Sequence, residues 1–478
     1  MITAAKKIKA SEKKLCMADD WRMRNDRRRI ILYKYSVEES EWRVVSSRAA
    51  VILALFNGER TVQEVAEYTA LLFKVNLAEA QTYITRILAE FYAKEQILVD
   101  SASFPDFDWY VYDPSEMVIA QDSFQLDKRL KAPLSLLLMP FNTCDVDCIY
   151  CYAERKPIGK TLSIERWREI INDAADAGVS VATFSGGDPM LYPQIMELLD
   201  ILIERDFLFL VSTKSLITVK MAKELAELGI GKRLFQISID AWDPEVADRI
   251  VQRKGYRDRA LLSIKNLLMY GIGVRTNTVC TPLNYQEVPT LLRHLAEIGV
   301  TKSTVTTYGR SLFRHQDSLF ISADQLAWLD NEINQLKTGL PEADVSFNGS
   351  IIDHNAISVE EKEKAWENRA NCSGGITSMT ICADGRVILC EQMPHNEIYT
   401  AGNVAKQGFL EVWNSQRMKD ITYPSQELFK ETVCYDCQSF DECHKVKGYC
   451  FRDALNVYGS IYQPPPNCPK APPAVRLG

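Results

Sequence analysis

The feature that most limits the fold of this sequence is an alternation of short apolar runs with longer amphipathic stretches through the middle of the chain. In one amphipathic stretch, Ser163 is placed to cap a helix and Gly178 to end it. The apolar runs are strand candidates, and they lie near 134–140, 181–185, 207–212, 234–239, 273–279 and 302–307. Six strand–helix units in succession predict a parallel sheet with right-handed crossovers. Because six strands are too few to close an eight-stranded barrel, we expect an α/β fold with a partial, open (β/α)6 barrel of the TIM type over residues 134–340.

The segment before the barrel predicts a separate small domain over residues 1–101. Strand-like runs at 28–35 and 42–46 are followed by three helical stretches, of which Thr61 and Asn76 are placed to cap the second and third. A returning strand is expected at 96–99. This order of elements is typical of a winged-helix domain. Proline and aspartate are frequent just after it, so residues 102–133 are expected to form a linker.

The segment after the barrel has a different composition. Residues 341–371 lack a clear helical or strand period and are expected to bridge to the last domain. In that domain, residues 372–478, glycine, proline and cysteine are frequent and long helical patterns are few. This composition indicates a small domain organised around metal rather than around a large apolar core.

The charge and hydropathy of the chain argue against two classes of partner. A net charge of −7 over 478 residues does not favour nucleic-acid binding. The apolar run at 134–141 is far shorter than the ~20 residues that a membrane span needs. No apolar core follows the lysines near the N-terminus, so a signal peptide is not predicted. We expect a soluble, cytoplasmic protein with neither a nucleic-acid nor a membrane partner.

Thirteen cysteines in such a protein need an explanation, because a reducing cytoplasm disfavours structural disulfides. Three of them, Cys144, Cys148 and Cys151, have the spacing C-x3-C-x2-C on a loop that directly follows the first predicted barrel strand. Three thiolates on one short loop can bind three corners of an iron–sulfur cubane and leave the fourth iron open to a chelating substrate. A structural zinc site is the alternative, but it usually needs four ligands.

This loop, with Tyr150 before its last cysteine, resembles the signature of the radical S-adenosylmethionine (SAM) superfamily. The resemblance implies that Cys144, Cys148 and Cys151 hold the catalytic 4Fe–4S cluster, and that SAM binds beside them. Gly186, Gly187 and Asp188 resemble the family's GGE motif, which receives the methionyl amine of SAM. By the same resemblance Tyr150, Ser212, Ser238 and Asp240 are expected among the SAM contacts. Lys214-Ser215 departs from the Asn-Gly common at that place.

The cysteines of the last domain resemble the SPASM module, which holds auxiliary clusters in peptide-modifying radical SAM enzymes. The resemblance implies two further 4Fe–4S clusters, and therefore three in all. One would be held by Cys434, Cys437, Cys443 and Cys468, and the other by Cys372, Cys390 and Cys450. Six residues lie between Cys443 and Cys450, where the pattern has three. Two zinc sites are the alternative. Whether Cys382 is a further ligand, or an iron stays open there, is left undecided by the sequence.

The N-terminal domain resembles the recognition element related to the pyrroloquinoline-quinone peptide chaperone. Such elements bind a leader peptide as an added strand at a sheet edge, beside the third helix. Together the three parts imply a radical SAM maturase of a ribosomally synthesised precursor peptide, reduced by an external donor such as ferredoxin or flavodoxin. A thioether from a substrate cysteine is the favoured product, because an open auxiliary iron could anchor its thiolate.

Several alternatives remain open at this point. Other maturases form carbon–carbon crosslinks, epimerise residues, or oxidise cysteine or serine to formylglycine as sulfatase maturases do. Two hypotheses lie outside the peptide-modifying enzymes: a non-catalytic iron–sulfur electron carrier, and a redox sensor that binds DNA through the winged helix.

Overall fold

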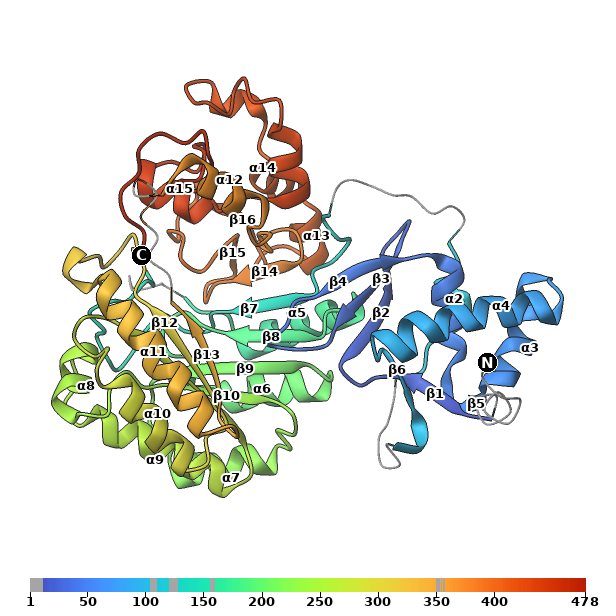
Figure 1. Cartoon of the computed structure of the whole chain (residues 1–478), viewed down its shortest axis with the longest axis horizontal. Helices are drawn as coiled ribbons and strands as arrows, with labels where there is room; N and C mark the ends of the chain where they lie inside the picture. The colour runs from blue at the N-terminus through green and yellow to red at the C-terminus, as the bar shows by residue number, and fades with distance from the viewer. Residues whose placement is uncertain are drawn as a thin grey trace. The chain divides into compact units, whose positions relative to one another are not determined.

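The computed structural model describes residues 12–103, 110–119, 128–154, 160–349, 353, 355 and 357–478. The chain forms two compact units, Met1–Leu126 and Asp127–Gly478 (Figure 1). The division between them falls inside the predicted linker. Among the helices that the structure describes, none has the length and apolar character needed to cross a membrane.

Within its described residues, the first unit contains two small antiparallel sheets and three α-helices. Strand β1 (Lys14–Met17) pairs with β5 (Asn57–Thr61) and β6 (Leu98–Asp100), and β3 (Ile30–Lys34) lies between β2 (Trp21–Asn25) and β4 (Trp42–Val45). The helices are α2 (Ser47–Leu55), α3 (Val62–Phe73) and α4 (Leu77–Ile87).

Local sequence signals fix the helix starts in this unit. Thr61 and Glu64 form a capping box at α3, and the Asn76 side chain accepts a hydrogen bond from the Glu79 N–H at α4, so both predicted caps are confirmed. Strand β5 begins at Asn57, and the sequence did not predict it because Asn57–Thr61 carries no apolar alternation.

The second unit is built on one ten-stranded sheet with the order β13-β12-β11-β10-β9-β8-β7-β14-β15-β16. The six predicted strands are all present and parallel, which confirms the α/β partial barrel. They are β7 (Ser135–Leu138), β8 (Val181–Phe184), β9 (Leu208–Thr213), β10 (Leu234–Ser238), β11 (Gly273–Cys280) and β12 (Lys302–Thr307). A seventh parallel strand, β13 (Asp344–Asn348), lies in the segment expected only to bridge.

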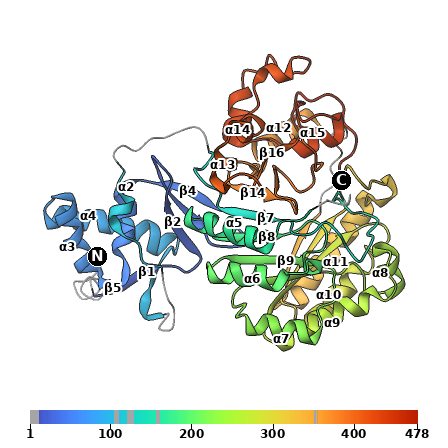
Figure 2. The same ribbon diagram turned by 180° about the vertical axis from the view of Figure 1, so that it is seen from behind.

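Amphipathic helices cover the barrel strands and bury their apolar faces against them. In α5 (Ile164–Asp176), Ser163 caps the first turn, and Trp167, Ile170 and Ile171 are almost fully buried, as the sequence predicted. The helices that follow run along the outer side of the strand row in Figures 1 and 2. They are α6 (Ile195–Glu204), α7 (Val219–Glu227), α8 (Pro244–Val251), α9 (Tyr256–Met269), α10 (Val288–Glu297) and α11 (Ala323–Gly339).

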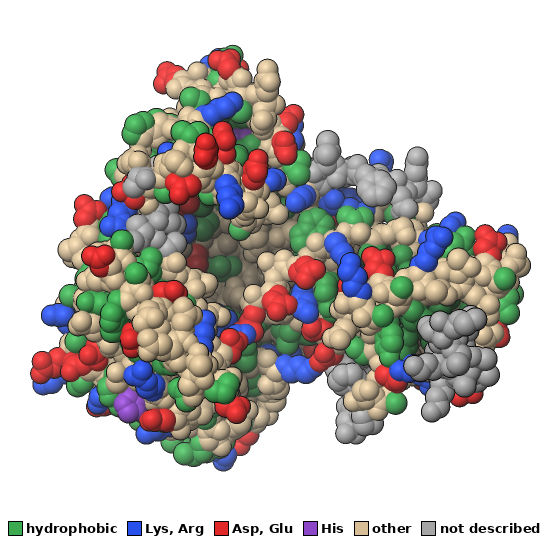
Figure 3. Space-filling model, viewed as in Figure 1, with side chains coloured by type: hydrophobic (Ala, Val, Ile, Leu, Met, Phe, Trp, Pro, Cys, Tyr) green, Lys and Arg blue, Asp and Glu red, His purple; other side chains and the backbone are tan. Residues whose placement is uncertain are grey.

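The C-terminal segment continues the sheet of the barrel. Strand β14 (Ser378–Ile381) pairs in parallel with β7, and the antiparallel strands β15 (Arg386–Ile388) and β16 (Thr400–Asn403) extend the row. Its helices are α12 (Val359–Glu367), α13 (Phe409–Asn414), α14 (Gln416–Thr422) and α15 (Phe451–Tyr458). Figure 3 shows acidic and basic side chains interspersed over the visible surface of this unit.

Candidate active site

A cavity of about 600 Å³ lies at the carboxyl ends of the barrel strands. Its wall contains residues from successive strand ends and also from the C-terminal segment. Those predicted as cluster ligands or SAM contacts are Cys144, Cys148, Tyr150, Cys151, Gly186, Gly187, Asp188, Ser212 and Ser238. The C-terminal segment contributes Gln392, Arg452 and Asp453. The structure therefore brings most of the predicted barrel residues together, and Asp240 is the exception.

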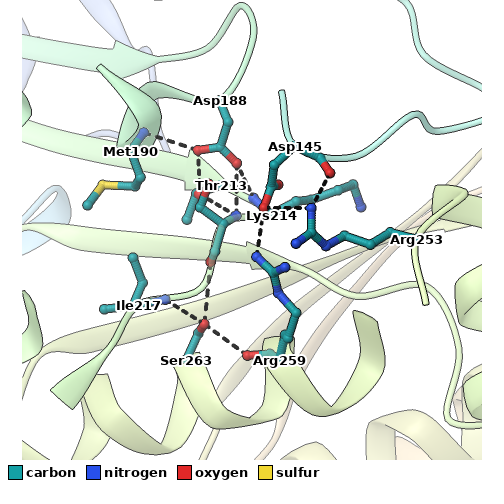
Figure 4. A network of polar contacts seen from close by, with 10 residues as sticks. Asp145, Asp188, Met190, Thr213, Lys214, Ile217, Arg253, Arg259 and Ser263 are labelled. Atoms are coloured by element: carbon teal, nitrogen blue, oxygen red, sulfur yellow. Dashed lines mark hydrogen bonds and ion pairs between the residues drawn. The ribbon is translucent and has the colours of Figure 1, made fainter. Parts of the chain in front are cut away.

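The three-cysteine loop is held in place by two of its own aspartates. Asp145 forms ion pairs with Arg253 at 3.1 Å and with Arg259 at 2.7 Å, as Figure 4 shows. Asp147 pairs with Arg314 at 2.6 Å. The loop backbone is also bonded to the end of α8, where the N–H groups of Asp147 and Ile149 donate to main-chain oxygens at 2.9 and 3.0 Å. Arg253 is therefore engaged with the loop.

The two glycines after β8 are required by close packing within the chain. A Cβ on Gly187 would lie 2.4 Å from the Thr143 nitrogen, and Gly186 has φ +103°, a backbone conformation that L side chains rarely adopt. The N–H groups of Gly187 and Asp188 donate to the carbonyls of Phe141 and Thr143 at 3.0 and 2.8 Å. The glycines thus press the end of β8 against the segment that enters Cys144.

The Asp188 carboxylate is buried and fully used by protein donors. It accepts hydrogen bonds from Thr213 Oγ1 at 2.6 Å and from the N–H groups of Lys214, Ser215 and Met190 at 2.8, 2.9 and 3.1 Å (Figure 4). Burial raises the pKa of Asp188, and these hydrogen bonds oppose that rise. Since the acceptor sites are occupied, a ligand amine at this place would meet main-chain carbonyls rather than this carboxylate.

Asp240 lies behind the cavity wall and does not line it. It has no exposed surface, and it accepts hydrogen bonds from the Tyr150 hydroxyl at 2.6 Å, the Val279 N–H at 3.0 Å and the Lys214 ammonium at 3.1 Å. Asp240 therefore positions Tyr150 and Lys214, whereas the sequence placed it among the SAM contacts. Ser212, by contrast, lines the cavity and accepts from Gln236 Nε2 at 2.8 Å.

Lys214 also lines the cavity. In the sequence it stands out only as a departure from the pattern of the radical SAM superfamily. Its side chain is 13% exposed and its ammonium lies over the rings of Tyr150 and Tyr256, 5.7 and 5.4 Å from their centroids. Burial has the largest effect and would lower the pKa of Lys214, but the neighbouring charges, of which Asp240 is the strongest, together raise it well above its usual value. Lys214 is therefore a permanent cation in the wall.

A partly buried chain of polar contacts joins the barrel to the C-terminal segment. The Tyr152 hydroxyl lies 2.9 Å from Ser185 Oγ and donates to Glu391 Oε2 at 3.2 Å. Burial raises the pKa of Glu391. Each of the three residues adjoins a predicted functional residue in sequence, since they follow Cys151, precede Gly186 and follow Cys390 respectively. No local sequence signal marks their contact.

The cysteines of the C-terminal segment fall into two electrostatically interacting groups. Cys372 interacts with Cys390 and with Cys450. The second group is Cys434, Cys437, Cys443 and Cys468. The grouping matches the two ligand sets that the resemblance implied. Within the described residues, no three His, Cys, Asp or Glu side chains form a ready-made site for a single metal ion.

Cys382 belongs to neither group. It is fully buried in a small apolar cluster with Met139 and Ile388. Burial raises the pKa of its thiol strongly, and its electrostatic neighbours are Asp384, Arg386 and Glu154.

The cysteines of the barrel loop and of the C-terminal segment fit iron–sulfur clusters in their donor chemistry. They offer soft thiolates in three sets, which are three residues on the loop, a second set of three, and one set of four.

Comparison with known proteins agrees with this arrangement. Residues 138–295 match the radical SAM superfamily, and residues 372–438 match the SPASM iron–sulfur cluster-binding domain. The chain is 25% identical over 393 residues to the antilisterial bacteriocin subtilosin biosynthesis protein AlbA of Bacillus subtilis, covering 76% of this chain and 81% of the relative. It is 27% identical over 349 residues to the Fe-coproporphyrin III synthase of Methanosarcina barkeri, covering 68% and 85%.

The fold is also similar to that of a solved structure. The crystal structure of Streptococcus suis SuiB bound to the precursor peptide SuiA superposes with a TM-score of 0.62 at 17% identity, over 96% of this chain and 98% of that one. At this identity the likeness concerns the fold alone. The chain therefore contains a radical SAM domain followed by a SPASM domain, as the matched segments, the cavity at the strand ends and the grouped cysteines all indicate.

Proposed function

We propose that this protein is a maturase that modifies a ribosomally synthesised precursor peptide by radical chemistry and joins a cysteine sulfur to a carbon of a neighbouring residue. The observation that carries the proposal is the composition of the cavity wall. Gln392, Arg452 and Asp453 lie two or three residues after cysteines of the first SPASM group, and they line the same cavity as Cys144, Cys148 and Cys151. A peptide in this cavity would meet the three-cysteine loop and these residues of the C-terminal segment.

Some barrel residues are proposed to contact SAM, and others to hold the site in position. With a cluster held by Cys144, Cys148 and Cys151, reductive cleavage of SAM supplies a 5′-deoxyadenosyl radical that can abstract hydrogen from an unactivated carbon. Gly186, Gly187, Ser212, Ser238 and Tyr150 are proposed to surround SAM. Asp145, Asp188 and Asp240 are proposed to hold the loop and the strand ends in position, because their oxygens are bonded to other protein groups.

The composition of the first SPASM group supports a thioether product. Cys372, Cys390 and Cys450 supply three thiolates, and Cys382 packs with apolar side chains. A cubane at a three-cysteine set keeps one corner for a ligand from outside the chain, and a substrate thiolate has the right chemistry for it. We propose that all three sites are occupied by 4Fe–4S clusters, reduced by an external donor such as ferredoxin or flavodoxin.

The first unit is proposed to bind the leader peptide. Its strand β4 forms one edge of the β2-β3-β4 sheet, and Val44 on that strand is 41% exposed. The Arg43 side chain pairs with Glu95, which follows the π-helical segment Leu88–Lys94 that continues the third helix, so this edge adjoins that continuation. Such an edge can accept an extended peptide as a further strand. Fluorescence anisotropy with candidate leader peptides, and with duplex DNA as the comparison, tests this part.

The experiment that tests the function combines turnover with mass spectrometry. Anaerobically reconstituted protein with dithionite and SAM should form 5′-deoxyadenosine, and the Cys148→Ala variant should not. With its precursor peptide the product should be two hydrogens lighter and its cysteine should resist alkylation. Failure of the wild-type protein to form 5′-deoxyadenosine would leave an electron carrier as the explanation. A two-hydrogen loss with an alkylatable thiol would indicate a carbon–carbon crosslink instead.

A further inference from the structure

The segment 444–449, between two cysteines of the last domain, is three residues longer than the SPASM pattern. This segment contacts the end of α12 at two places. The Lys447 ammonium donates to the Glu367 carbonyl at 2.8 Å, and the Gly448 carbonyl accepts from Arg369 Nε at 3.4 Å. The longer segment is therefore attached to Arg369, a residue that lies outside the SPASM cysteine pattern.

Arg369 also contacts a cysteine of the second SPASM group. Its Nη2 donates to Cys443 Sγ at 3.6 Å, and its Nη1 donates to the Trp366 carbonyl at 2.6 Å. The guanidinium lies over the Trp366 ring, with Cζ 3.5 Å from the ring centroid. Together with the bond to Gly448, these contacts use each nitrogen of the guanidinium. Because the fork is planar and rigid, they fix its position beside the sulfur.

The contact between Arg369 and Cys443 is also electrostatic. Burial lowers the pKa of Arg369, but a guanidinium still stays protonated in proteins. The charges that act most on it are those of Cys443 and Cys468, followed by Glu442. Burial raises the pKa of the Cys443 thiol to about 12, and the positive charge of Arg369 opposes that rise. Arg369 therefore favours the thiolate form, which is the form that binds iron.

A donor at a ligand sulfur has a known effect on an iron–sulfur cluster. One-electron reduction adds a negative charge that is shared by the irons and their thiolates. A hydrogen bond and a positive charge at one thiolate stabilise the reduced cluster more than the oxidised cluster, so the reduction potential rises. No proton moves in this step, because the guanidinium is already protonated.

We propose that Arg369 is a positioning residue for the auxiliary cluster of the second SPASM group, and that its bond to Cys443 raises the reduction potential of that cluster. This rests on the part of the proposed function that places a 4Fe–4S cluster at these four cysteines. It gives the longer segment 444–449 a function, because the Gly448 carbonyl helps to hold the guanidinium where it reaches the sulfur.

The test measures reduction potentials in the full-length protein, reconstituted anaerobically and kept free of SAM. Dithionite lowers the potential stepwise, and electron paramagnetic resonance gives the midpoint of each cluster. Arg369→Met should lower one midpoint by about 59 mV, a tenfold change in a one-electron equilibrium, and leave the other midpoints and the iron content unchanged. The midpoint that moves should be the one that is absent when both Cys434 and Cys437 are replaced by alanine.

Three further variants separate the bond to sulfur from a general effect on the domain. Arg369→Lys keeps the charge without the planar fork, and it should lower the same midpoint by a smaller amount. Lys447→Met removes the other bond to the end of α12 and touches no sulfur. Arg417→Met removes a guanidinium that is bonded to the Ile398 and Thr400 carbonyls. Neither of these two should move a midpoint.

The possible results distinguish this inference from the proposed function. Unchanged midpoints in Arg369→Met, an equal shift in Lys447→Met, or a loss of about four irons from Arg369→Met would each overturn the inference and leave the peptide modification standing. A wild-type protein without a reducible cluster at the second group would overturn both the inference and the proposed cluster count. A lowered midpoint in Arg369→Met, in a protein that forms no 5′-deoxyadenosine, would support the inference and overturn the maturase.

Discussion

Replacing Asp188 tests whether its carboxylate serves the fold or the ligand. In the family the corresponding residue is usually glutamate, so Asp188→Glu restores the common residue. If the carboxylate were a ligand to the SAM amine, the longer side chain should preserve or improve SAM binding. The structure predicts the opposite, because both oxygens are already bonded to Thr213, Lys214, Ser215 and Met190 within a site that is 3% exposed.

The sizes of the effects follow from these four hydrogen bonds. Asp188→Ala leaves the main-chain N–H groups of Lys214 and Met190 without an acceptor, whereas the Ser215 N–H keeps its bond to Thr213 Oγ1 at 2.9 Å. At about 1–3 kcal/mol for each lost acceptor, the free energy of unfolding should fall by about 4 kcal/mol. In Asp188→Asn the amide oxygen can still serve Lys214 and Ser215, and the Thr213 hydroxyl can turn to accept from the amide nitrogen. We expect a loss of about 3 kcal/mol, from the Met190 N–H and from the weaker neutral bonds. Asp188→Glu adds a methylene to a packed site and should cost about 1–3 kcal/mol.

Urea unfolding of the four proteins, followed by far-ultraviolet circular dichroism, measures this order. SAM affinity should fall with stability in all three variants, since each disturbs the strand ends around Lys214. The reasoning is refuted if Asp188→Glu binds SAM more tightly than the wild type. It is also refuted if Asp188→Ala and Asp188→Asn both lose less than about 1 kcal/mol, the size of one ordinary hydrogen bond.

Three further predictions concern other contacts. Cys382→Ala should leave the iron content unchanged and cost about 1 kcal/mol of stability, whereas Cys390→Ala should lose about four irons; equal iron losses would make Cys382 a ligand. Because burial raises the pKa of Glu391, the folded chain holds that proton more tightly than the unfolded chain, so this group's contribution to stability should fall as pH rises above about 4.3. Glu391→Gln should remove that part of the pH dependence, as measured by urea unfolding across pH 4–7. Asp145→Ala should lower the free energy of unfolding by about 1–2 kcal/mol, more than Arg253→Ala or Arg259→Ala alone, because one carboxylate serves both guanidinium groups. A loss in Asp145→Ala no larger than the loss in either arginine variant would contradict this.

The sequence predicts the elements whose signals are local. The six barrel strands are short runs of apolar and β-branched residues between helical patterns, and Thr61, Asn76 and Ser163 are capping residues directly before helices. Strand β13 was missed because it is an edge strand with one buried residue, so it has no apolar run to detect. The pairing of β14 with β7 was missed because nothing in either strand specifies a partner so distant in the chain.

In the candidate site, too, the residues in local motifs were predictable from the sequence, and the contacts between distant residues were not. The cysteines, the glycines and Ser212 were predicted because they stand in short motifs or at strand ends, and many of them line the cavity. The contacts of Asp188 and Asp240 were not predicted, since the sequence around an acidic residue at a strand end is the same whether it faces a ligand or a neighbouring strand. Their oxygens are occupied by donors from β9, β11 and the cysteine loop, and those contacts exist only in the folded chain. The contacts of Lys214 with Asp240, Tyr150 and Tyr256 likewise exist only in the folded chain.

The parallel pairing of β7 with β14 has a consequence for the order of events during synthesis. Strand β7 leads directly into the three-cysteine loop, and one of its two neighbours is made only when residues 378–381 have been translated. Until then β7 is an edge strand with unpaired main-chain groups, which invites pairing with other chains. The ribosome must therefore complete most of the protein before the loop rests on a finished sheet. Formation of the SAM-cleaving centre is tied to the arrival of the domain that holds the auxiliary cysteines, so a nascent chain passes through a long interval with a barrel but no finished active site.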